Sequence, residues 1–594
     1  MCGIFGYIGK GDASQIIVNG LKRLEYRGYD SWGVAVVDVN SRSDNKIKII
    51  KKVGAIGDLN ELTFLPKSNI GLGHTRWATH GGVTTTNAHP HYASDNSFVL
   101  AQNGIVENYQ DLKKDLITKG HLFKSQTDTE VIVRLIEEKR KTLHDLRKSA
   151  RAAFLELKGR NTIILMASSG EQVIAVRNGS PLVIGVGDGE YFFASDTLSF
   201  ADKTDQAIFI NDHEMGEYFK NEIKLYDVDT DKTLPVKVSK LDHDDVTIEK
   251  EGFKHFMLKE IVEQKYTIRE AIQYSEAELK PLLDAIGKAR NVYTIGAGTA
   301  NYAASQIAYF LRKFANIRAI ELKSYEVDSF EKLFSAKDLV IAVSQSGETA
   351  DTIEAVEIAK KQGCKVASIV NMVGSTLTRI SDYPYFSRSG PEICVASTKA
   401  FTAQISWGLL VAKSFVGNYQ EARNLISDLT TKLEKYFDDD LFKHVKQLTK
   451  KIVNNEHFFV LGRGQNYYIA LEAALKIKEI SYKHFEGFAA GELKHGVIAL
   501  IEKGTPVFII ASNDSDKDNM LAATAEVKSR GAYVIGIGQE NNELFDDFIA
   551  TIDTKGIDSL TNVIPFQLLS YYLALELDRN PDKPRNLAKS VTVK

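Results

Sequence analysis

Two copies of one strand–turn–helix pattern in the C-terminal half restrict the fold more than any other feature of the sequence. Each copy runs from an apolar strand through a Gly-x-Gly turn into a helix, over residues 292–312 and 458–480. A second apolar strand that ends in serine follows in each copy, at Leu339–Ser344 and Val507–Ser512. Strands that alternate with helices are typical of parallel sheets, so the pattern predicts an internal duplication of a doubly wound α/β unit.

The first 238 residues contain short strand-prone runs in place of this alternation. The runs are Ile4–Ile8, Trp32–Val39, Ile47–Val53, Phe98–Gln102, Asn161–Ala167, Gln172–Arg177 and Tyr191–Ala194. Turn residues separate them, and a helical pattern at Asp128–Arg140 lies among them. This mixture predicts an α+β domain with packed sheets. The acidic stretch Lys240–Gly252 then marks a domain boundary.

The composition narrows the class of protein. At 594 residues, the chain is too long for one hydrophobic core, so several domains are expected. The net charge of -3 gives no reason to expect nucleic acid or an anionic membrane surface as a partner. The three cysteines, Cys2, Cys364 and Cys394, lack metal-ligand spacing, so we expect neither disulfides nor a metal site. Without a signal segment or a long apolar run, the protein is expected to be cytoplasmic.

Cys2 is the first candidate for covalent chemistry. Removal of Met1 would leave Cys2 with a free α-amine beside its thiol. An α-amine with a pKa of about 8 can accept the thiol proton near neutral pH, so the thiolate could attack a carboxamide. Gly3 and Gly6 would permit close approach of the backbone. Taken alone, a start codon followed by a small buried cysteine is the commoner explanation.

Several separated segments, in the same order, resemble the glutaminase domain of N-terminal-nucleophile amidotransferases. They are Met1–Tyr7, Tyr26–Ser31, Gly73–Gly81, Asn87–Pro90, Asn103–Asn108 and Thr127–Glu130. The resemblance implies an αββα sandwich in which Cys2 attacks glutamine, and Asn103 and the Gly104 N–H form the oxyanion hole. The residues that it implies for glutamine binding are Arg76, Trp77, Thr79, His80 and Asp128. Arg76 would pair with the α-carboxylate and Asp128 with the α-ammonium.

A second candidate site follows the strand Leu339–Ser344. The turn Ser344–Thr349 precedes the expected helix Ala350–Gln362, and N–H groups and hydroxyls at a helix start suit a phosphate dianion. A well-capped helix without a ligand explains this motif equally well. The corresponding turn of the second copy, Ser512–Asp518, carries carboxylates that would repel phosphate. Gly296–Asn301 lacks the third glycine of a dinucleotide loop, so we expect no nicotinamide cofactor there.

The strand, the turn and the duplication resemble the sugar isomerase fold, and further segments resemble the isomerase half of the glutamine–fructose-6-phosphate transaminases (isomerizing). Those segments are Val395–Phe401, Ala470–Tyr482, Ala489–Gly496 and Pro584–Val593. The resemblance covers essentially the whole chain. It implies a sugar phosphate site formed by Thr299, Ser344, Gln345, Ser346, Thr349, Val395 and Ala588.

The same resemblance implies four catalytic side chains in this half. Lys589 would form a Schiff base with the open-chain ketone, although a tail lysine is ordinarily only solvated. Glu479 would move a proton between C1 and C2, and Lys476, one helical turn earlier, would tune its carboxylate. His495 would open and close the sugar ring and could act across a subunit boundary. Lys476 and Glu479 could also be an ordinary surface pair.

Trp32 and Ala300 depart from the pattern of the family, whereas Trp77 matches it and takes its role from the resemblance. Trp32 stands where a small residue is usual, and Ala300 where serine is frequent, so one phosphate contact could be missing. Trp77 resembles the gate of an ammonia passage.

The expected domains are a glutaminase (2–238), a linker (239–280), two sugar isomerase domains (281–425 and 446–580) and a tail that contributes to the sugar site (581–594).

The resemblance therefore implies a cofactor-free homodimeric enzyme that takes glutamine and fructose 6-phosphate as substrates. Ammonia released at Cys2 would pass to the sugar site and replace Lys589 on the ketose carbon. Amidotransferases that form phosphoribosylamine or asparagine share the glutaminase, but they need a phosphoribosyl-pyrophosphate or ATP site. A non-catalytic sugar-phosphate sensor would have no use for Cys2, and a deglycase would not need the glutaminase segments.

Overall fold

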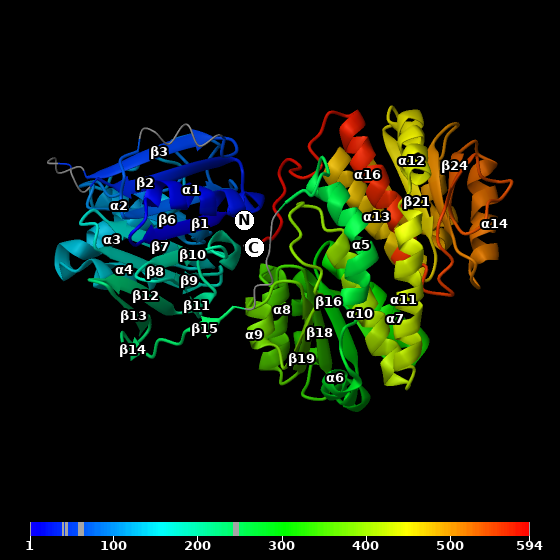
Figure 1. The fold of residues 1–594 in the computed structure, drawn as a ribbon, viewed down its shortest axis with the longest axis horizontal. Coiled ribbons are helices and arrows are strands. Elements are labelled where there is room, and N and C mark those ends of the chain that lie inside the picture. Colours follow the sequence, from blue (N-terminus) through cyan, green and yellow to red (C-terminus); the bar gives the residue numbers. More distant parts are fainter. Residues whose placement is uncertain (1, 39–40, 42–45, 58–64, 242–248, 593–594) are drawn as a thin grey trace. The chain divides into compact units, whose positions relative to one another are not determined.

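The computed structural model describes residues 2–38, 41, 46–57, 65–241 and 249–592. The described residues form two compact units, one of residues 2–241 with 590–592 and one of residues 249–589 (Figure 1). Among the described residues, no helix is both long enough and apolar enough to cross a membrane. Each unit has hydrophobic clusters of its own.

The first unit contains two mainly antiparallel sheets with helices on both outer faces. One sheet has the strand order β15-β11-β9-β10-β1-β4-β2-β3 and the other β14-β13-β12-β8-β7-β6-β5. The strands are β1 (Gly3–Ile8), β2 (Ser31–Val37), β3 (Ile47–Val53), β4 (Ile70–Arg76), β5 (His91–Tyr92), β6 (Phe98–Gly104), β7 (Asn161–Ala167), β8 (Gln172–Asn178), β9 (Val183–Val186), β10 (Tyr191–Ala194), β11 (Gln206–Phe209), β12 (Glu214–Phe219), β13 (Glu222–Asp227), β14 (Thr233–Leu234) and β15 (Ser239–Lys240). The helices are α1 (Ala13–Leu24), α2 (Tyr109–Thr118), α3 (Thr129–Leu143) and α4 (Leu146–Phe154).

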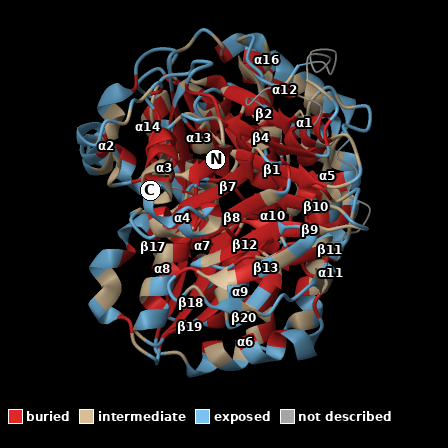
Figure 2. Cartoon of the chain, turned by 90° about the vertical axis from the view of Figure 1, so that its left-hand side faces the viewer, coloured by how far each residue is buried: buried red, intermediate tan, exposed pale blue. Residues whose placement is uncertain are grey.

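Three apolar layers hold this unit together. One cluster joins α1 to the outer face of the first sheet, a second lies between the sheets, and a third joins the second sheet to α3 and α4. Figure 2 shows the buried strands β1, β7 and β8 inside these layers, whereas α2 is largely exposed. The arrangement is the αββα sandwich that the resemblance implied. Trp32 is buried in the α1 layer, where its ring packs as an apolar core residue.

The second unit contains two five-stranded parallel sheets of identical topology. Their orders are β17-β16-β18-β19-β20 and β22-β21-β23-β24-β25, so each copy has its second strand at one edge and its first strand next to it. The strands are β16 (Val292–Gly296), β17 (Ala319–Lys323), β18 (Leu339–Ser344), β19 (Lys365–Val370), β20 (Tyr383–Phe386), β21 (His457–Gly462), β22 (His484–Ala489), β23 (Pro506–Ala511), β24 (Tyr533–Gly538) and β25 (Asp547–Ala550). The predicted duplication of a parallel α/β unit is confirmed.

Helices cover both faces of these sheets. They are α5 (Phe256–Glu270), α6 (Glu276–Lys288), α7 (Thr299–Ala315), α8 (Ala350–Lys361), α9 (Thr376–Ile380), α10 (Lys399–Phe415), α11 (Tyr419–Tyr436), α12 (Asp439–Ile452), α13 (Gln465–Ser481), α14 (Lys517–Lys528), α15 (Ser559–Asn562) and α16 (Ile564–Glu576). Short 3-10 turns include η5 (Ala490–His495) and η6 (Val497–Leu500). Part of the stretch that we expected to be a linker, residues 239–280, is therefore helical, because it contains α5 and the start of α6.

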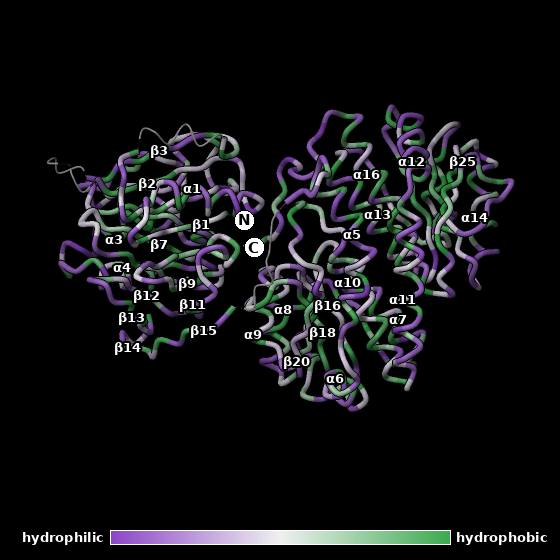
Figure 3. The backbone as a smooth tube through the Cα atoms, in the orientation of Figure 1, coloured by the Kyte–Doolittle hydropathy of each residue, from purple (hydrophilic) through white to green (hydrophobic). Residues whose placement is uncertain are grey.

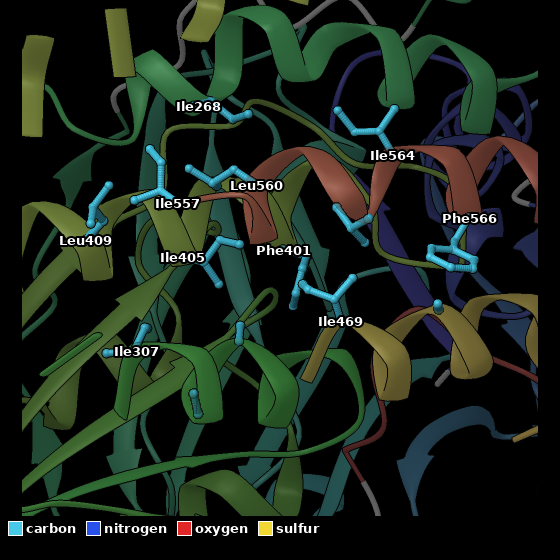
Figure 4. Packing of buried hydrophobic residues seen from close by; sticks show 14 of the residues in the cluster. Ile268, Ile307, Phe401, Ile405, Leu409, Ile469, Ile557, Leu560, Ile564 and Phe566 are labelled. Atoms are coloured by element: carbon cyan, nitrogen blue, oxygen red, sulfur yellow. The ribbon is translucent and has the colours of Figure 1, made fainter. Parts of the chain in front are cut away.

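One hydrophobic core serves both copies of the second unit. A single cluster contains apolar residues of α5, α7 and α10 together with those of α13 and α16. Figure 4 shows this packing: Ile268 of α5, Ile307 of α7 and Phe401 of α10 lie in the same core as Ile469 of α13 and Ile564 of α16. Figure 3 shows hydrophobic residues concentrated along the strands and the inner helices. The two copies thus fold against each other.

Candidate active sites

The Cys2 thiol lies at the start of β1, beside the end of β4. Its Sγ accepts a hydrogen bond from the Trp77 N–H at 3.2 Å. Gly3 pairs with Thr75 in the sheet, which fixes Cys2 at the end of the strand pair. Burial raises the pKa of the thiol, while the Trp77 N–H and the Arg76 guanidinium lower it. The thiol therefore needs a nearby base before it can act as a nucleophile.

The residues after β4 form a tightly held loop around Arg76. The Asp30 carboxylate accepts the Ala78 N–H at 2.8 Å, and the buried Arg76 guanidinium donates to the carbonyls of residues 80–82. A Cβ at Gly28 would lie 2.8 Å from the Trp77 nitrogen, so only glycine lets these segments approach. These contacts fix the position of the Trp77 N–H, which donates to the Cys2 thiol.

Asn103 and Gly104 end β6 on the other sheet. The Asn103 Nδ2 donates to the Cys2 carbonyl at 2.9 Å. Gly104 has φ +128°, and a Cβ there would lie 1.9 Å from the Arg160 carbonyl oxygen. Both strain and contact therefore require glycine at this position. The structure thus brings the predicted nucleophile and Asn103, a predicted oxyanion donor, into contact.

Asp128 and His80 occupy the remaining part of this site. The Asp128 carboxylate is buried and accepts the Val106 N–H at 2.8 Å. Burial raises its pKa, whereas the Val106 N–H and His80 lower it. Arg76 is an electrostatic neighbour of both Cys2 and Asp128, so the structure brings the predicted carboxylate-binding cation near both the thiol and the predicted ammonium-binding anion. Thr79, in contrast, is exposed.

In the second unit, the predicted phosphate site is the turn after β18. The Gly347 N–H donates to the Ser344 Oγ at 2.9 Å, and the Ser344 Oγ lies 3.5 Å from the Thr349 Oγ1. Gly347 has φ +66°, and a Cβ there would lie 2.1 Å from the Ser375 Oγ. Gln345, Ser346 and Thr349 are partly exposed, so their polar groups can meet a ligand at the start of α8.

In the second copy, the corresponding turn contains an ion pair between Arg463 and Asp516. The Arg463 Nε donates to the Asp516 carboxylate at 2.8 Å, beside the start of α13. A Cβ at Gly464 would lie 2.7 Å from the Asp516 Oδ2, which shows how closely that carboxylate approaches the Gly-x-Gly turn. A carboxylate at this place disfavours a second phosphate.

Thr299 and Glu472 connect the two copies beside this site. The Thr299 hydroxyl, at the start of α7, donates to the Glu472 Oε1 at 3.2 Å. The Lys476 Nζ lies 2.5 Å from Glu479 and 3.7 Å from Glu472. Burial raises the pKa of Glu472 to about 8, against the opposing effect of Lys476. Because Lys476 is fully buried between two carboxyl groups, it is not a surface cation.

Lys589 reaches a buried carboxylate from the C-terminal tail. Its Nζ lies 2.5 Å from Glu392 and donates to the Cys394 carbonyl at 2.8 Å. The tail is held nearby because Asp582 accepts two N–H groups at the start of α5, and its carbonyl accepts the Val395 N–H at 3.2 Å. Burial raises the pKa of Glu392, but the Lys589 ammonium outweighs it and holds the pKa below its usual value.

For two predicted site residues, His495 and Ala588, the structure gives a position but no contact that tests the predicted role. His495 is exposed at the end of η5, and its side chain makes no hydrogen bond or ion pair with any residue that the structure describes. Ala588 is half-buried in the tail next to Lys589. The predicted role of His495 in ring opening stays a prediction. Ala300 lies in the first turn of α7, where it offers no hydroxyl.

Sequence reasoning missed two acidic residues of the sugar half. Glu392 is the partner of Lys589, and its only sequence signal is a single acid in an otherwise uncharged loop between Arg388 and Lys399. Glu472 lies one helical turn before Lys476, on the face that was already assigned to the site. That spacing could have identified Glu472.

Comparison with known proteins finds two matching domain families and similar proteins that extend over the whole chain. Residues 57–257 match the glutamine amidotransferase domain family, and residues 285–414 and 451–577 match the SIS domain family. The glutamine--fructose-6-phosphate aminotransferase [isomerizing] of Pyrococcus horikoshii is 41% identical over 100% of both chains. The protein of the same name from Aquifex aeolicus is 38% identical, also over 100% of both chains.

Solved structures give a similar result for the second unit. The C-terminal domain of glucosamine-fructose-6-phosphate aminotransferase from Francisella tularensis is 31% identical, with a TM-score of 0.51. The match covers 56% of this chain and 100% of that one. Together with the full-length relatives, these matches show that the chain belongs to the glutamine--fructose-6-phosphate aminotransferase [isomerizing] family.

Proposed function

We propose that this chain converts D-fructose 6-phosphate and glutamine into D-glucosamine 6-phosphate and glutamate. The observation that carries the proposal is that one chain holds two complete side-chain clusters: Cys2 with Asn103, and Lys589 with Glu392. The first suits release of ammonia from an amide, and the second suits covalent capture of a ketone. Full-length similarity to the aminotransferases supports the pairing of both reactions in one enzyme.

In the glutaminase half, Cys2 attacks the carboxamide carbon of glutamine. The α-amine that removal of Met1 would leave on Cys2 takes the thiol proton. The Asn103 Nδ2 and the Gly104 N–H stabilise the oxyanion of the tetrahedral intermediate. Ammonia leaves, and water hydrolyses the resulting thioester to glutamate. Arg76 and Asp128 hold the α-carboxylate and the α-ammonium of the substrate, while Trp77, Thr79 and His80 border it.

In the sugar half, the phosphate binds the turn Ser344–Thr349 and the open-chain ketone meets Lys589. For the amine to attack C2, Lys589 must pass its proton to an acceptor, and Glu392 is in contact with it. Water leaves as the Schiff base forms, and ammonia then displaces Lys589. Glu479 removes a proton from C1 and returns it to C2, which gives the aldehyde at C1 and the amine at C2.

The proposal extends to assembly and cellular role. We place the reaction in the cytoplasm, as the opening step of hexosamine and cell-wall precursor synthesis, with ammonia passing internally between the two sites. The exposed His495 precedes η6, whose Leu500 is 56% exposed. An exposed apolar turn beside a histidine that has no partner among the described residues supports a homodimer in which His495 acts on the sugar of the partner chain.

Product analysis tests the proposal. Purified protein mixed with glutamine and fructose 6-phosphate is expected to form glutamate and glucosamine 6-phosphate in equal amounts. Cys2→Ala is expected to form neither, and Lys589→Ala to form glutamate without amino sugar. Glutamate without amino sugar from the unmodified protein would contradict the sugar assignment, and the absence of both products would contradict the whole proposal.

A further inference from the structure

His74 lies inside the first unit, two residues before Arg76 on β4. Its side chain is fully buried, and its Nε2 has two neighbours. One is the Gln102 carbonyl oxygen at 3.0 Å, and the other is the Asn103 Oδ1 at 3.2 Å. No role in the proposed chemistry has been given to this imidazole so far.

The Gln102 carbonyl determines which nitrogen of His74 carries the proton. A peptide carbonyl can only accept a hydrogen bond, so the Nε2 must be a donor. The Asn103 amide must then present its oxygen, because its NH2 group would direct a hydrogen at the Nε2–H. At the other end of the amide, the Asn103 Nδ2 donates to the Cys2 carbonyl, which also can only accept.

We infer that His74 is a positioning residue of the glutaminase, which holds the Asn103 amide with its NH2 group toward Cys2. This inference rests on the proposed role of Asn103 in the oxyanion hole. An asparagine amide can turn by 180° and exchange its oxygen for its nitrogen at little steric cost. A turned amide would place an oxygen against the developing oxyanion, so the orientation decides whether Asn103 stabilises or repels that charge.

The surroundings of His74 keep the imidazole neutral and fixed. The His89 ring lies against it at a tilt of 34°, with a centroid distance of 4.3 Å, and the His91 ring lies 4.9 Å from that of His89. Burial, together with the cations Arg76 and Lys51, lowers the pKa of His74 to about 3, against the opposing effect of the two hydrogen bonds. The Nδ1 has no hydrogen-bond partner among the described residues, so the single proton stays on the Nε2.

The test compares a side chain that can donate from this place with side chains that cannot. His74→Gln keeps an N–H at a similar distance along the side chain, whereas His74→Met and His74→Phe fill the space without a donor. We expect kcat for glutamine hydrolysis to fall roughly tenfold in the two non-donors, with KM unchanged, and to be largely retained in His74→Gln. Alkylation of Cys2 by iodoacetamide should proceed at the unmodified rate in all three, since that reaction forms no oxyanion.

Asn103→Ala separates this inference from the proposed function. That variant should lose kcat by roughly 100-fold or more, and adding His74→Met to it should cause no further loss, because the amide is gone. If Asn103→Ala lowers kcat but His74→Met does not, the inference fails and the oxyanion hole stands. Equal losses in His74→Gln and His74→Met, or additive losses with Asn103→Ala, would also overturn it. If Asn103→Ala leaves kcat unchanged, both the positioning role of His74 and the proposed role of Asn103 in the oxyanion hole are wrong.

Melting temperatures recorded with these rates distinguish a packing defect from lost positioning. Met and Phe differ in shape, so a defect of packing should differ between them, while the missing donor is common to both. A loss of kcat that follows the melting temperature across the three variants would assign His74 to packing and would overturn the inference.

Discussion

Lys589 and Glu392 form a buried ion pair whose side chains are 3% and 0% exposed. Taking two charges out of water is costly, and their mutual attraction offsets that cost only while both partners are present. Glu260 lies near them with its own carboxyl group, and burial together with the charge of Glu392 raises the pKa of Glu260 to about 8. The Lys589–Glu392 pair therefore lies beside a carboxyl group whose burial favours its neutral form.

Removing one partner of this pair should destabilise the protein more than removing both. Glu392→Gln leaves the Lys589 ammonium buried without a counterion, which should cost about 3 kcal/mol and lower the melting temperature. Glu392→Gln combined with Lys589→Met removes the stranded charge and should recover part of that loss. Thermal melting at pH 7 measures both variants. A double variant that is as unstable as the sum of the two single variants would contradict the pairing.

Glu472 gives a pH dependence with a defined sign. Its pKa is raised to about 8 in the folded chain, against a usual value of 4.5. Below pH 4.5 the carboxyl group is protonated in both states, and between pH 4.5 and 8 only the unfolded chain loses the proton. Its contribution to stability is thus present at low pH and lost as the pH rises through about 8.

The neutral substitution Glu472→Gln removes this dependence. We expect the variant to match the unmodified protein in free energy of unfolding at pH 4 and to exceed it at pH 8 by on the order of 4 kcal/mol. Melting curves across this range provide the measurement, and Glu486→Gln, the same exchange at a partly exposed carboxyl group, is the control. A pH-independent difference for Glu472→Gln would show that this carboxyl group is ionised in both states.

At the scale of single elements, the turn between β18 and α8 depends on one glycine. Gly347→Ala would place a Cβ 2.1 Å from the Ser375 Oγ at a φ of +66°, so the phosphate turn must shift. KM for fructose 6-phosphate should rise about tenfold or more, while glutamine hydrolysis should be unaffected. Gly417→Ala is the matched control, since it has φ +81° but nothing within 4 Å of the new Cβ. Equal effects of the two substitutions on KM would contradict the role of this turn.

The two copies of the α/β unit should differ in ligand binding although they share a topology. The Ser344–Thr349 turn offers hydroxyls and N–H groups, whereas the second copy has the Arg463–Asp516 ion pair at the same place. Isothermal titration of Cys2→Ala with fructose 6-phosphate should give one site per chain. A stoichiometry of two would show that the acidic turn also accepts a phosphate.

Elements with strong periodicity could be predicted from the sequence. The strands at 47–53, 161–167 and 191–194 have the predicted bounds because their apolar residues alternate or run continuously between turns. β4 was not predicted as a strand, because glycines at 71 and 73 interrupt its apolar pattern. Both are needed in the fold, since a Cβ at either would lie 2.5 Å from Ile17 of α1.

Site residues that belong to a local sequence motif could be predicted, whereas contacts between segments far apart in the sequence could not. The Cys2 and Ser344–Thr349 segments have local signals, and in the structure Asn103 contacts Cys2 while the Ser344 and Thr349 hydroxyls lie within 3.5 Å of each other. The Lys589–Glu392 contact joins residues 197 positions apart, and nothing in either segment indicates the other. Such pairs depend on how the tail folds over α5, which local patterns do not contain.

At the scale of the whole molecule, we propose that two sites of different chemistry perform one reaction. The two halves of the sugar unit share one hydrophobic core, so the Thr299–Glu472 contact and the residues around it are held as a single body. The glutaminase unit has separate cores. The claim that unites them is that the nitrogen released at Cys2 is the nitrogen that reaches the sugar.

The most direct test follows that nitrogen atom. The protein is supplied with fructose 6-phosphate, glutamine labelled with ¹⁵N in the amide, and a large excess of unlabelled ammonium. Mass spectrometry then measures the label in glucosamine 6-phosphate. The account predicts that the product carries ¹⁵N at close to the enrichment of the glutamine, whatever the ammonium concentration. A label that falls as unlabelled ammonium is added would show that ammonia escapes to solution, and would contradict internal transfer.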